Sequence, residues 1–224
     1  KIRKVSSAGV VTTFAGSGVA GLSNGTGAAA QFNHPLGLAL DASGNLYVTD
    51  SSNNKIRKIT SGGIVTDYAG TGATGSSNST ALNSTFNNPT GLVFDSAGNL
   101  FVSDASNHTI RRIAANGGSV TLFAGQVGVS GNTNATGASA TFNFPVGLTI
   151  DASNNLYLAD YGNHCIRKIT SGAAVTTYIG LCGVNGKVNG SGAVVRFDSP
   201  SFIAIDSSNN LYVADFGNHC IRKI

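Results

Sequence analysis

The heptapeptide Asn163-His164-Cys165-Ile166-Arg167-Lys168-Ile169 decides how the whole chain is organised, because its apolar and basic second half recurs along the sequence. The same strand pattern begins at residues 1, 55, 109, 165 and 220, which are 54 to 56 residues apart. A fixed period of this length indicates a repeat protein in which each unit is one supersecondary structure. We therefore predict repeats at about residues 1–54, 55–108, 109–164 and 165–219, followed by a partial strand at 220–224.

Each unit contains four short apolar runs separated by turn residues, as expected for a four-stranded antiparallel sheet. In the first complete unit these runs are residues 36–40, 46–49, 55–59 and 64–69. The first two runs are nearly continuously apolar, so both of their faces need cover, which sheets stacked around an axis provide. We therefore predict an all-β fold, a β-propeller built from four-stranded antiparallel blades.

Eight aspartates occupy two repeated turn positions. The first set begins turns of the form Asp-x-x-(Gly/Asn)-Asn and consists of Asp41, Asp95, Asp151 and Asp206. An Asp side chain can cap turn amides, and Gly or Asn in the fourth position tolerates a positive φ. The second set follows the second apolar run and consists of Asp50, Asp104, Asp160 and Asp215. We interpret both sets as structural turn residues that cap their own turns.

The order of these motifs resembles a known family. The pattern Phe-x-x-Pro-x-Gly, then Gly-Asn-Leu-Tyr-Val-x-Asp, then Gly-Asn-His-x-Ile-Arg-Lys is similar to the NHL repeat. Asn163-His164-Cys165 and Asn218-His219-Cys220 match it best, whereas Asn53-Asn54-Lys55 lacks the histidine. The resemblance covers the whole chain. It implies a β-propeller, commonly with six blades, and binding more often than catalysis.

The number of strands does not fit a closed ring of four blades. The chain supplies the last two strands of one blade, three complete blades and the first three strands of another, which is one strand too many. We expect either an open arc of a larger propeller, such as one of six blades, or self-assembly through the terminal strands. Both ends fall within the strand pattern, so we expect a mature or excised piece of a longer array.

Four long connections, rich in Gly, Ser, Thr and Asn, join the last strand of each blade to the next blade. They are residues 16–34, 70–88, 125–144 and 180–199. In propellers this connection and the loop between the second and third strands emerge on the same face, so we expect a protein or glycan partner there. The alternative is that the loops only pack against one another, anchored by Phe32, Phe86, Phe142 and Phe197.

Each long connection also contains an Asn-x-(Ser/Thr) tripeptide. The asparagines are Asn24, Asn78, Asn134 and Asn189, and two more tripeptides begin at Asn83 and Asn107. In a protein secreted by a eukaryote these would be candidate N-glycosylation sites. A chain so rich in Asn, Ser and Thr also produces such tripeptides by chance, and the sequence leaves both explanations open.

The histidines and cysteines give little indication of a metal site or a catalytic site. His108, His164 and His219 occupy equivalent positions in successive units, which spreads them around a ring, so we expect structural hydrogen bonds and neither a metal site nor a cofactor. Cys182 lies in a long connection from which it could form a disulfide with Cys165 or with Cys220. One disulfide with one free thiol, or no disulfide at all, fits the sequence, and the odd number of cysteines leaves a bond to a partner chain open.

Charge is scarce and regular. Charged residues make up 11% of the chain, the formal net charge is +4, and twelve of the fourteen Lys and Arg residues belong to the repeated strands. Because these cations are distributed around the ring, we expect them to pair with the aspartates or remain solvated, and we do not expect nucleic-acid binding. No apolar run approaches the roughly 18 residues that a membrane-spanning helix requires.

We therefore expect a non-enzymatic scaffold or adhesion module that is extracellular or at the cell surface. The low charge, the hydroxyl-rich loops and the spare strand support this expectation. Two alternatives remain open at the level of sequence. One is a propeller lyase or hydrolase with an axial metal, of which only part is present. The other is a protein-binding or RNA-binding NHL domain.

Overall fold

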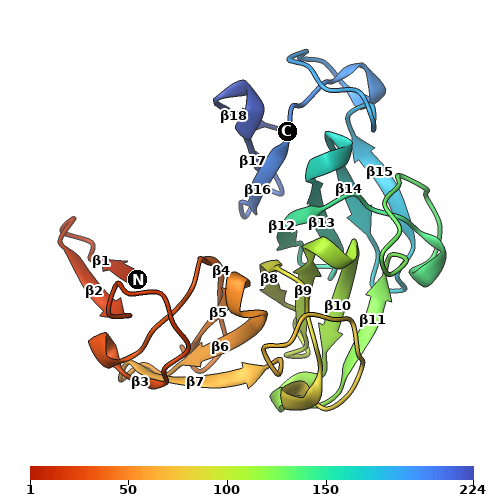
Figure 1. Cartoon of the computed structure of the whole chain (residues 1–224). Helices are drawn as coiled ribbons and strands as arrows, with labels where there is room; N and C mark the ends of the chain where they lie inside the picture. Colours follow the sequence, from red (N-terminus) through yellow and green to blue (C-terminus); the bar gives the residue numbers. More distant parts are fainter.

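The computed structural model describes all 224 residues, and its regular structure consists of β-strands and short 3-10 turns. The sheets are arranged as blades around a common axis and form an open arc (Figure 1). The strands within each blade pair antiparallel to their neighbours. The predicted fold class, an all-β propeller, is confirmed.

The arc contains three complete blades and parts of two others. The first partial blade consists of β1 (Ile2–Val5) and β2 (Val11–Ala15). The first complete blade consists of β4 (Pro35–Leu40), β5 (Leu46–Asp50), β6 (Lys55–Ile59) and β7 (Ile64–Ala69). The second consists of β8 (Pro89–Phe94), β9 (Leu100–Asp104), β10 (Thr109–Ile113) and β11 (Val120–Ala124). The third consists of β12 (Pro145–Ile150), β13 (Leu156–Asp160), β14 (Cys165–Ile169) and β15 (Val175–Ile179). The last partial blade consists of β16 (Pro200–Ile205), β17 (Leu211–Asp215) and β18 (Cys220–Lys223).

Nine 3-10 turns lie in the connections. Four of them join the second and third strands of a blade: η2 (Ser51–Asn53), η4 (Ala105–Asn107), η7 (Tyr161–Asn163) and η9 (Phe216–Asn218). Four lie in the long connections: η1 (Gly27–Ala29), η3 (Ala81–Asn83), η6 (Gly137–Ser139) and η8 (Gly192–Val194). The ninth is η5 (Ala115–Gly117). None of these helices has the length and hydropathy needed to cross a membrane.

One strand was not expected from the sequence. Within the first long connection, β3 (Gly25–Thr26) pairs with Ile64 and Val65 of β7, so the connection runs along the outer edge of the following blade. Isolated bridges from Thr80 to Ser119 and from Thr136 to Ala174 repeat this arrangement in the next two blades. The long connections are therefore attached to the blade that follows them.

The hydrophobic core lies between successive blades. One cluster joins Tyr47 and Ile56 of the first complete blade to Phe86, Leu92 and Leu100 of the second unit. Further clusters repeat this packing at the next two boundaries. The innermost strands β4, β8, β12 and β16 lie next to one another around the axis (Figure 1). Strands β8 and β12, which have a neighbour on each side, are covered on both faces, in keeping with their nearly continuous apolar sequence.

A glycine allows the innermost strands to approach closely. A Cβ atom on Gly147 of β12 would lie 2.6 Å from the carbonyl oxygen of Ser201 in β16, and Gly37 and Gly91 meet the next strand in the same way. In β16 the equivalent residue is Phe202, which is 43% exposed. Another blade of this repeat therefore cannot pack on β16 as closely as the blades within the chain pack on each other.

Candidate functional site

The long connections and the turns between second and third strands lie at the same end of the blades. The backbone N–H of Asn33 donates to Asp50 Oδ1 at 2.6 Å, and Asn53 Nδ2 donates to the carbonyl oxygen of Gly21 at 2.8 Å. We call this end the loop end. It comprises the long connections 16–34, 70–88, 125–144 and 180–199 together with the turns 50–54, 104–108, 160–164 and 215–219.

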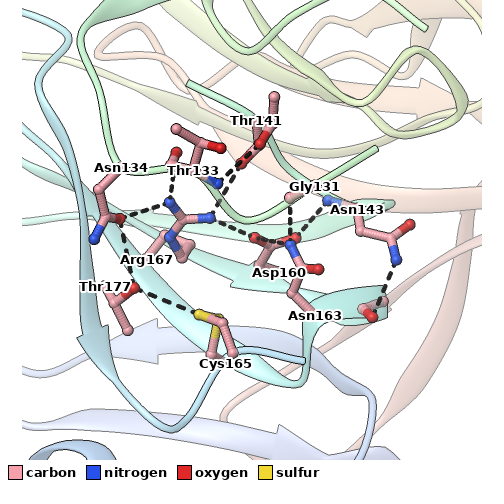
Figure 2. Close-up of polar contacts among 12 residues, drawn as sticks. Gly131, Thr133, Asn134, Thr141, Asn143, Asp160, Asn163, Cys165, Arg167 and Thr177 are labelled. Carbon is pink, nitrogen blue, oxygen red and sulfur yellow. Dashed lines mark hydrogen bonds and ion pairs between the residues drawn. A yellow bond between two sulfur atoms is a disulfide. The ribbon is translucent and has the colours of Figure 1, made fainter. Parts of the chain in front are cut away.

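An arginine of the third strand lies beneath each long connection, and Figure 2 shows Arg167 with its partners. Arg167 Nη1 donates to Asp160 Oδ2 at 2.9 Å, and Arg167 Nη2 donates to Asn134 Oδ1 at 2.8 Å. Its guanidinium also donates to the carbonyl oxygens of Thr133 and Thr141 and stacks over the ring of Phe142. The arginine thus fastens a long connection to the third strand of the blade.

The same arrangement recurs in every unit. The equivalent ion pairs are Arg57 with Asp50, Arg111 with Asp104 and Arg222 with Asp215, at 2.9 to 3.0 Å. Arg57, Arg111 and Arg167 are at most 1% exposed. The constant spacing of Asp, Asn and Arg, as in Asp160, Asn163 and Arg167, is a sequence signal from which this network could have been found.

The second set of aspartates does not cap the amides of its own turn. Asp160 Oδ1 accepts a hydrogen bond from the backbone N–H of Asn143 in the long connection, and Asp160 Oδ2 accepts from Asn163 Nδ2 and from Arg167. The expected capping is replaced because the carboxylate points inward to a buried cation. Burial raises the pKa of Asp160 to about 6, against the opposing effects of Arg167 and the hydrogen bonds. Asp160 and Arg167 form an ion pair at 2.9 Å in which both side chains are 0% exposed.

The first set of aspartates caps its own turns at the opposite end of the blades. Asp151 Oδ1 accepts from the backbone N–H groups of Ser153 and Asn155, and its Oδ2 accepts from Asn155 Nδ2 and the Tyr157 hydroxyl. Partial burial raises the pKa of Asp151, but these hydrogen bonds lower it further, so the net pKa lies below its ordinary value. Asp41, Asp95 and Asp206 make the same backbone contacts.

The asparagines of the Asn-x-(Ser/Thr) tripeptides differ in their surroundings. Asn24, Asn78, Asn134 and Asn189 each accept a hydrogen bond through Oδ1 from the arginine of the following third strand, at 2.6 to 2.8 Å, and remain exposed. Their recurrence therefore has a structural explanation. Asn83 is exposed as well. Asn107 is buried, and its Nδ2 donates to Gly75 and to Asp104, so in the folded chain it has no free amide nitrogen to carry a glycan.

The histidines and cysteines also hold the loop end together. His108 Nδ1 accepts from the backbone N–H of Phe144 at 3.0 Å, and His164 Nδ1 accepts from that of Ser199 at 2.9 Å. Of the two disulfide pairings left open by the sequence, the structure contains Cys165–Cys182, and Cys220 is free. No three His, Cys or Asp side chains converge closely enough to hold a metal ion.

The geometry defines a class of protein: a β-propeller arc whose repeated charged residues fasten long loops to a rigid frame. The family model for the NHL repeat matches residues 32–59, 86–113, 142–169 and 197–224, which together make up half of the chain. The chain belongs to the NHL-repeat family.

Known proteins with similar sequences or folds differ in what they do. The chain is 31% identical over 151 residues to NHL repeat-containing protein 2 of Bos taurus, covering 62% of this chain and 21% of that protein. Its fold is similar to that of an auxiliary nutrient binding protein from Bacteroides ovatus, with a TM-score of 0.70 and 20% sequence identity. The match covers 87% of this chain and 48% of that protein. Its fold is also similar to that of a streptogramin B lyase, with a TM-score of 0.59 and 16% sequence identity. This match covers 86% of this chain and 52% of the lyase. The chain thus spans about a fifth of the first protein and about half of each solved structure.

Proposed function

We propose that this chain is part of a non-enzymatic binding module that presents its loop end to a protein or glycan partner. The observation that carries the proposal is the fastening of each long connection by an arginine of the third strand, since loops ordered in advance lose little entropy when they bind. The aspartates of this network and three of its four arginines are buried, so the loop surface is formed mainly by hydroxyl, amide and aliphatic groups.

Exposed aliphatic side chains lie on all four connections and support a protein partner over a glycan. They include Val19, Leu22, Leu82, Val127, Val129, Leu181, Val184, Val188 and Val194. Neither Val127 nor Val129 packs into an interblade core, so both can be changed without emptying the core.

The test compares capture of proteins from the source's extracellular fraction by the chain and by its Val127→Lys/Val129→Lys variant. We expect the variant to lose the captured partner. A matched control, Ser61→Lys and Ser171→Lys at the opposite end, should retain it. Equal capture by all three proteins would contradict binding through the loop end.

The proposed location is extracellular or at the cell surface. The disulfide between Cys165 and Cys182 supports it, because disulfides persist mainly in oxidising compartments. The mass of native material would reveal glycans on Asn24, Asn78, Asn83, Asn134 or Asn189. A bare peptide mass from a cytosolic fraction would contradict the location.

Self-assembly is proposed to use strand pairing at β18. The outer edge of β18 has no partner strand, and a groove of about 980 Å³, lined in part by Phe197, Ile221 and Arg222, follows it. Phe202 disfavours packing of whole blades, whereas a strand added at this edge avoids it. Pairing is supported if the molar mass measured by light scattering rises with protein concentration and this rise is lost in Ile221→Pro. A monomer mass at every concentration excludes it.

The enzymatic and RNA-binding alternatives are distinguished by two measurements. Stoichiometric metal in native protein, held by residues that differ between units, would favour a lyase or hydrolase. Strongly salt-dependent binding of RNA would favour the nucleic-acid alternative. The burial of Arg57, Arg111 and Arg167 removes three cations from contact with phosphates.

A further inference from the structure

A hollow of about 560 Å³ lies between the first and second complete blades. Because the strands are antiparallel, the turns that line it, residues 41–45 and 95–98, are at the end opposite the loop end. Its floor is aromatic. The centre of the Tyr47 ring lies 4.7 Å from the centre of the Tyr68 ring and 4.9 Å from that of the Phe94 ring, and both pairs pack edge to face. The hollow is thus separate from the surface proposed above.

The walls of this hollow carry both donors and acceptors of hydrogen bonds. The half-buried Lys58 places Nζ 5.5 Å from the centre of the Tyr47 ring and makes no hydrogen bond or ion pair within the chain. On the same wall the Tyr47 hydroxyl donates to Asp41 Oδ2 at 3.2 Å. An unpaired ammonium therefore faces the same space as a carboxylate and a phenol oxygen.

The hollow is larger than the space at the next blade boundary. At the next blade boundary, Ser96 and Asn154 join the two turns through hydrogen bonds of 3.0 and 3.1 Å, and the remaining space is about 220 Å³. At the first boundary the equivalent residues are Ala42 and Gly98, which have no side-chain polar group. The basic residue also differs, since Arg112 donates to Asn99 whereas Lys58 has no acceptor.

We propose that this hollow binds one pyranose ring of a glycan. A sugar offers hydroxyl groups to both Lys58 and Asp41, and it can place an apolar C–H face on Tyr68 and Phe94. A simple cation would be opposed by Lys58, and a simple anion by Asp41 and Asp95. An apolar ligand would bury these charged groups without partners.

The decisive variant closes the hollow with residues that the next boundary already uses. Ala42→Ser/Gly98→Asn recreates the Ser96 and Asn154 pair. Gly98 has φ +80°, a region that Asn154 adopts at the equivalent position, and a Cβ there would meet only Ala115 Cβ at 3.7 Å. We therefore expect the variant to fold with an unchanged melting temperature.

Binding is measured by saturation-transfer NMR with methyl glycosides of glucose, galactose, mannose and N-acetylglucosamine at millimolar concentration. We expect at least one probe to bind the unmodified chain and to lose binding in the closed variant. Lys58→Gln should weaken binding on the order of tenfold, because it removes a charged donor. The matched control Lys168→Gln, whose Nζ also lies 5.5 Å over a tyrosine ring, should not. Failure of all four probes, or equal binding after closure or after Lys58→Gln, would overturn the proposal.

Discussion

The buried arginines need more partners than any other residue in the chain, because a buried guanidinium requires both hydrogen-bond acceptors and an opposite charge. Arg167 is removed from solvent, yet its two terminal nitrogens find four acceptors, and its charge is balanced by Asp160. A buried ion pair adds little to stability compared with an apolar pair, but removing one partner leaves an uncompensated charge. The pair therefore fixes which loop conformation is compatible with the fold.

Arg167→Met should lower the free energy of unfolding by about 3–5 kcal/mol, because it leaves the Asp160 carboxylate buried without a cation. Chemical denaturation measures this loss. Lys168→Met on the same strand, where the side chain is half-buried and unpaired, should change it by at most about 0.5 kcal/mol. Similar losses in the two variants would show that the ion pair has no special role.

The capping aspartates predict a pH dependence of stability. The pKa of Asp151 in the folded chain is lower than the ordinary value of 3.8. Its contribution to stability is therefore fully present above about pH 4 and is lost as the pH falls through the folded pKa. We expect the difference in unfolding free energy between the chain and Asp151→Asn to shrink between pH 5 and pH 2. A difference that is constant over this range is the contrary result.

At the scale of elements, the innermost strands determine how blades stack. Gly147 brings the backbone of β12 against Ser201 and Phe202 of β16, which leaves no room for a methyl group. The outermost strands are fixed differently, since a long connection pairs along β7 and equivalent bridges reach the next two blades. Each blade is thus held on the inside by backbone proximity and on the outside by a loop.

Gly147→Ala should destabilise the chain by about 1–3 kcal/mol, because the new Cβ lies 2.6 Å from the Ser201 carbonyl oxygen and the strands must separate. The melting temperature reports the effect. Gly172→Ala is the control, since its Cβ would meet only Thr170 Oγ1 at 3.9 Å. If both substitutions gave the same melting temperature, close packing of the innermost strands would not limit stability.

At the scale of the whole molecule, the arc has two ends that each pack on one side only. Leu38 of β4 is 51% exposed, whereas the equivalent Leu92, Leu148 and Ile203 are 4–8% exposed. Only one residue of β1 is buried and none of β18, although β10 and β14 are almost wholly buried. Stability is therefore unevenly distributed along the arc.

Hydrogen exchange should reveal this gradient. We expect amides in residues 1–15 and 211–224 to exchange at least about tenfold faster than those in residues 100–113 and 156–169, because the end blades can open without disturbing the middle. Mass spectrometry of peptic fragments gives the rates. Uniform protection would mean that the arc unfolds as one cooperative unit.

Local sequence signals were sufficient for the blades but not for their connections. Runs such as 55–59 and 64–69 carry their own turns and apolar pattern, so their strands could be predicted from the sequence. The contact between Asn134 and Arg167 joins residues far apart in the chain, and the choice of Cys165 over Cys220 depends on their positions in space. The interblade hollow depends on Ala42 and Gly98, where side chains are small or absent, and an absence leaves no pattern to find.

The arginine network has a consequence for building artificial arrays from these units. All partners of the Arg57 guanidinium, from Asn24 and Phe32 to Asp50, lie within residues 16–69. A gene fragment cut at 54/55, where the strand pattern begins anew, would place Asp50 and Arg57 in different modules. Cuts at 69/70, 124/125 and 179/180 keep each guanidinium with its own carboxylate and loop. The module to duplicate thus starts with a long connection and ends with the outermost strand.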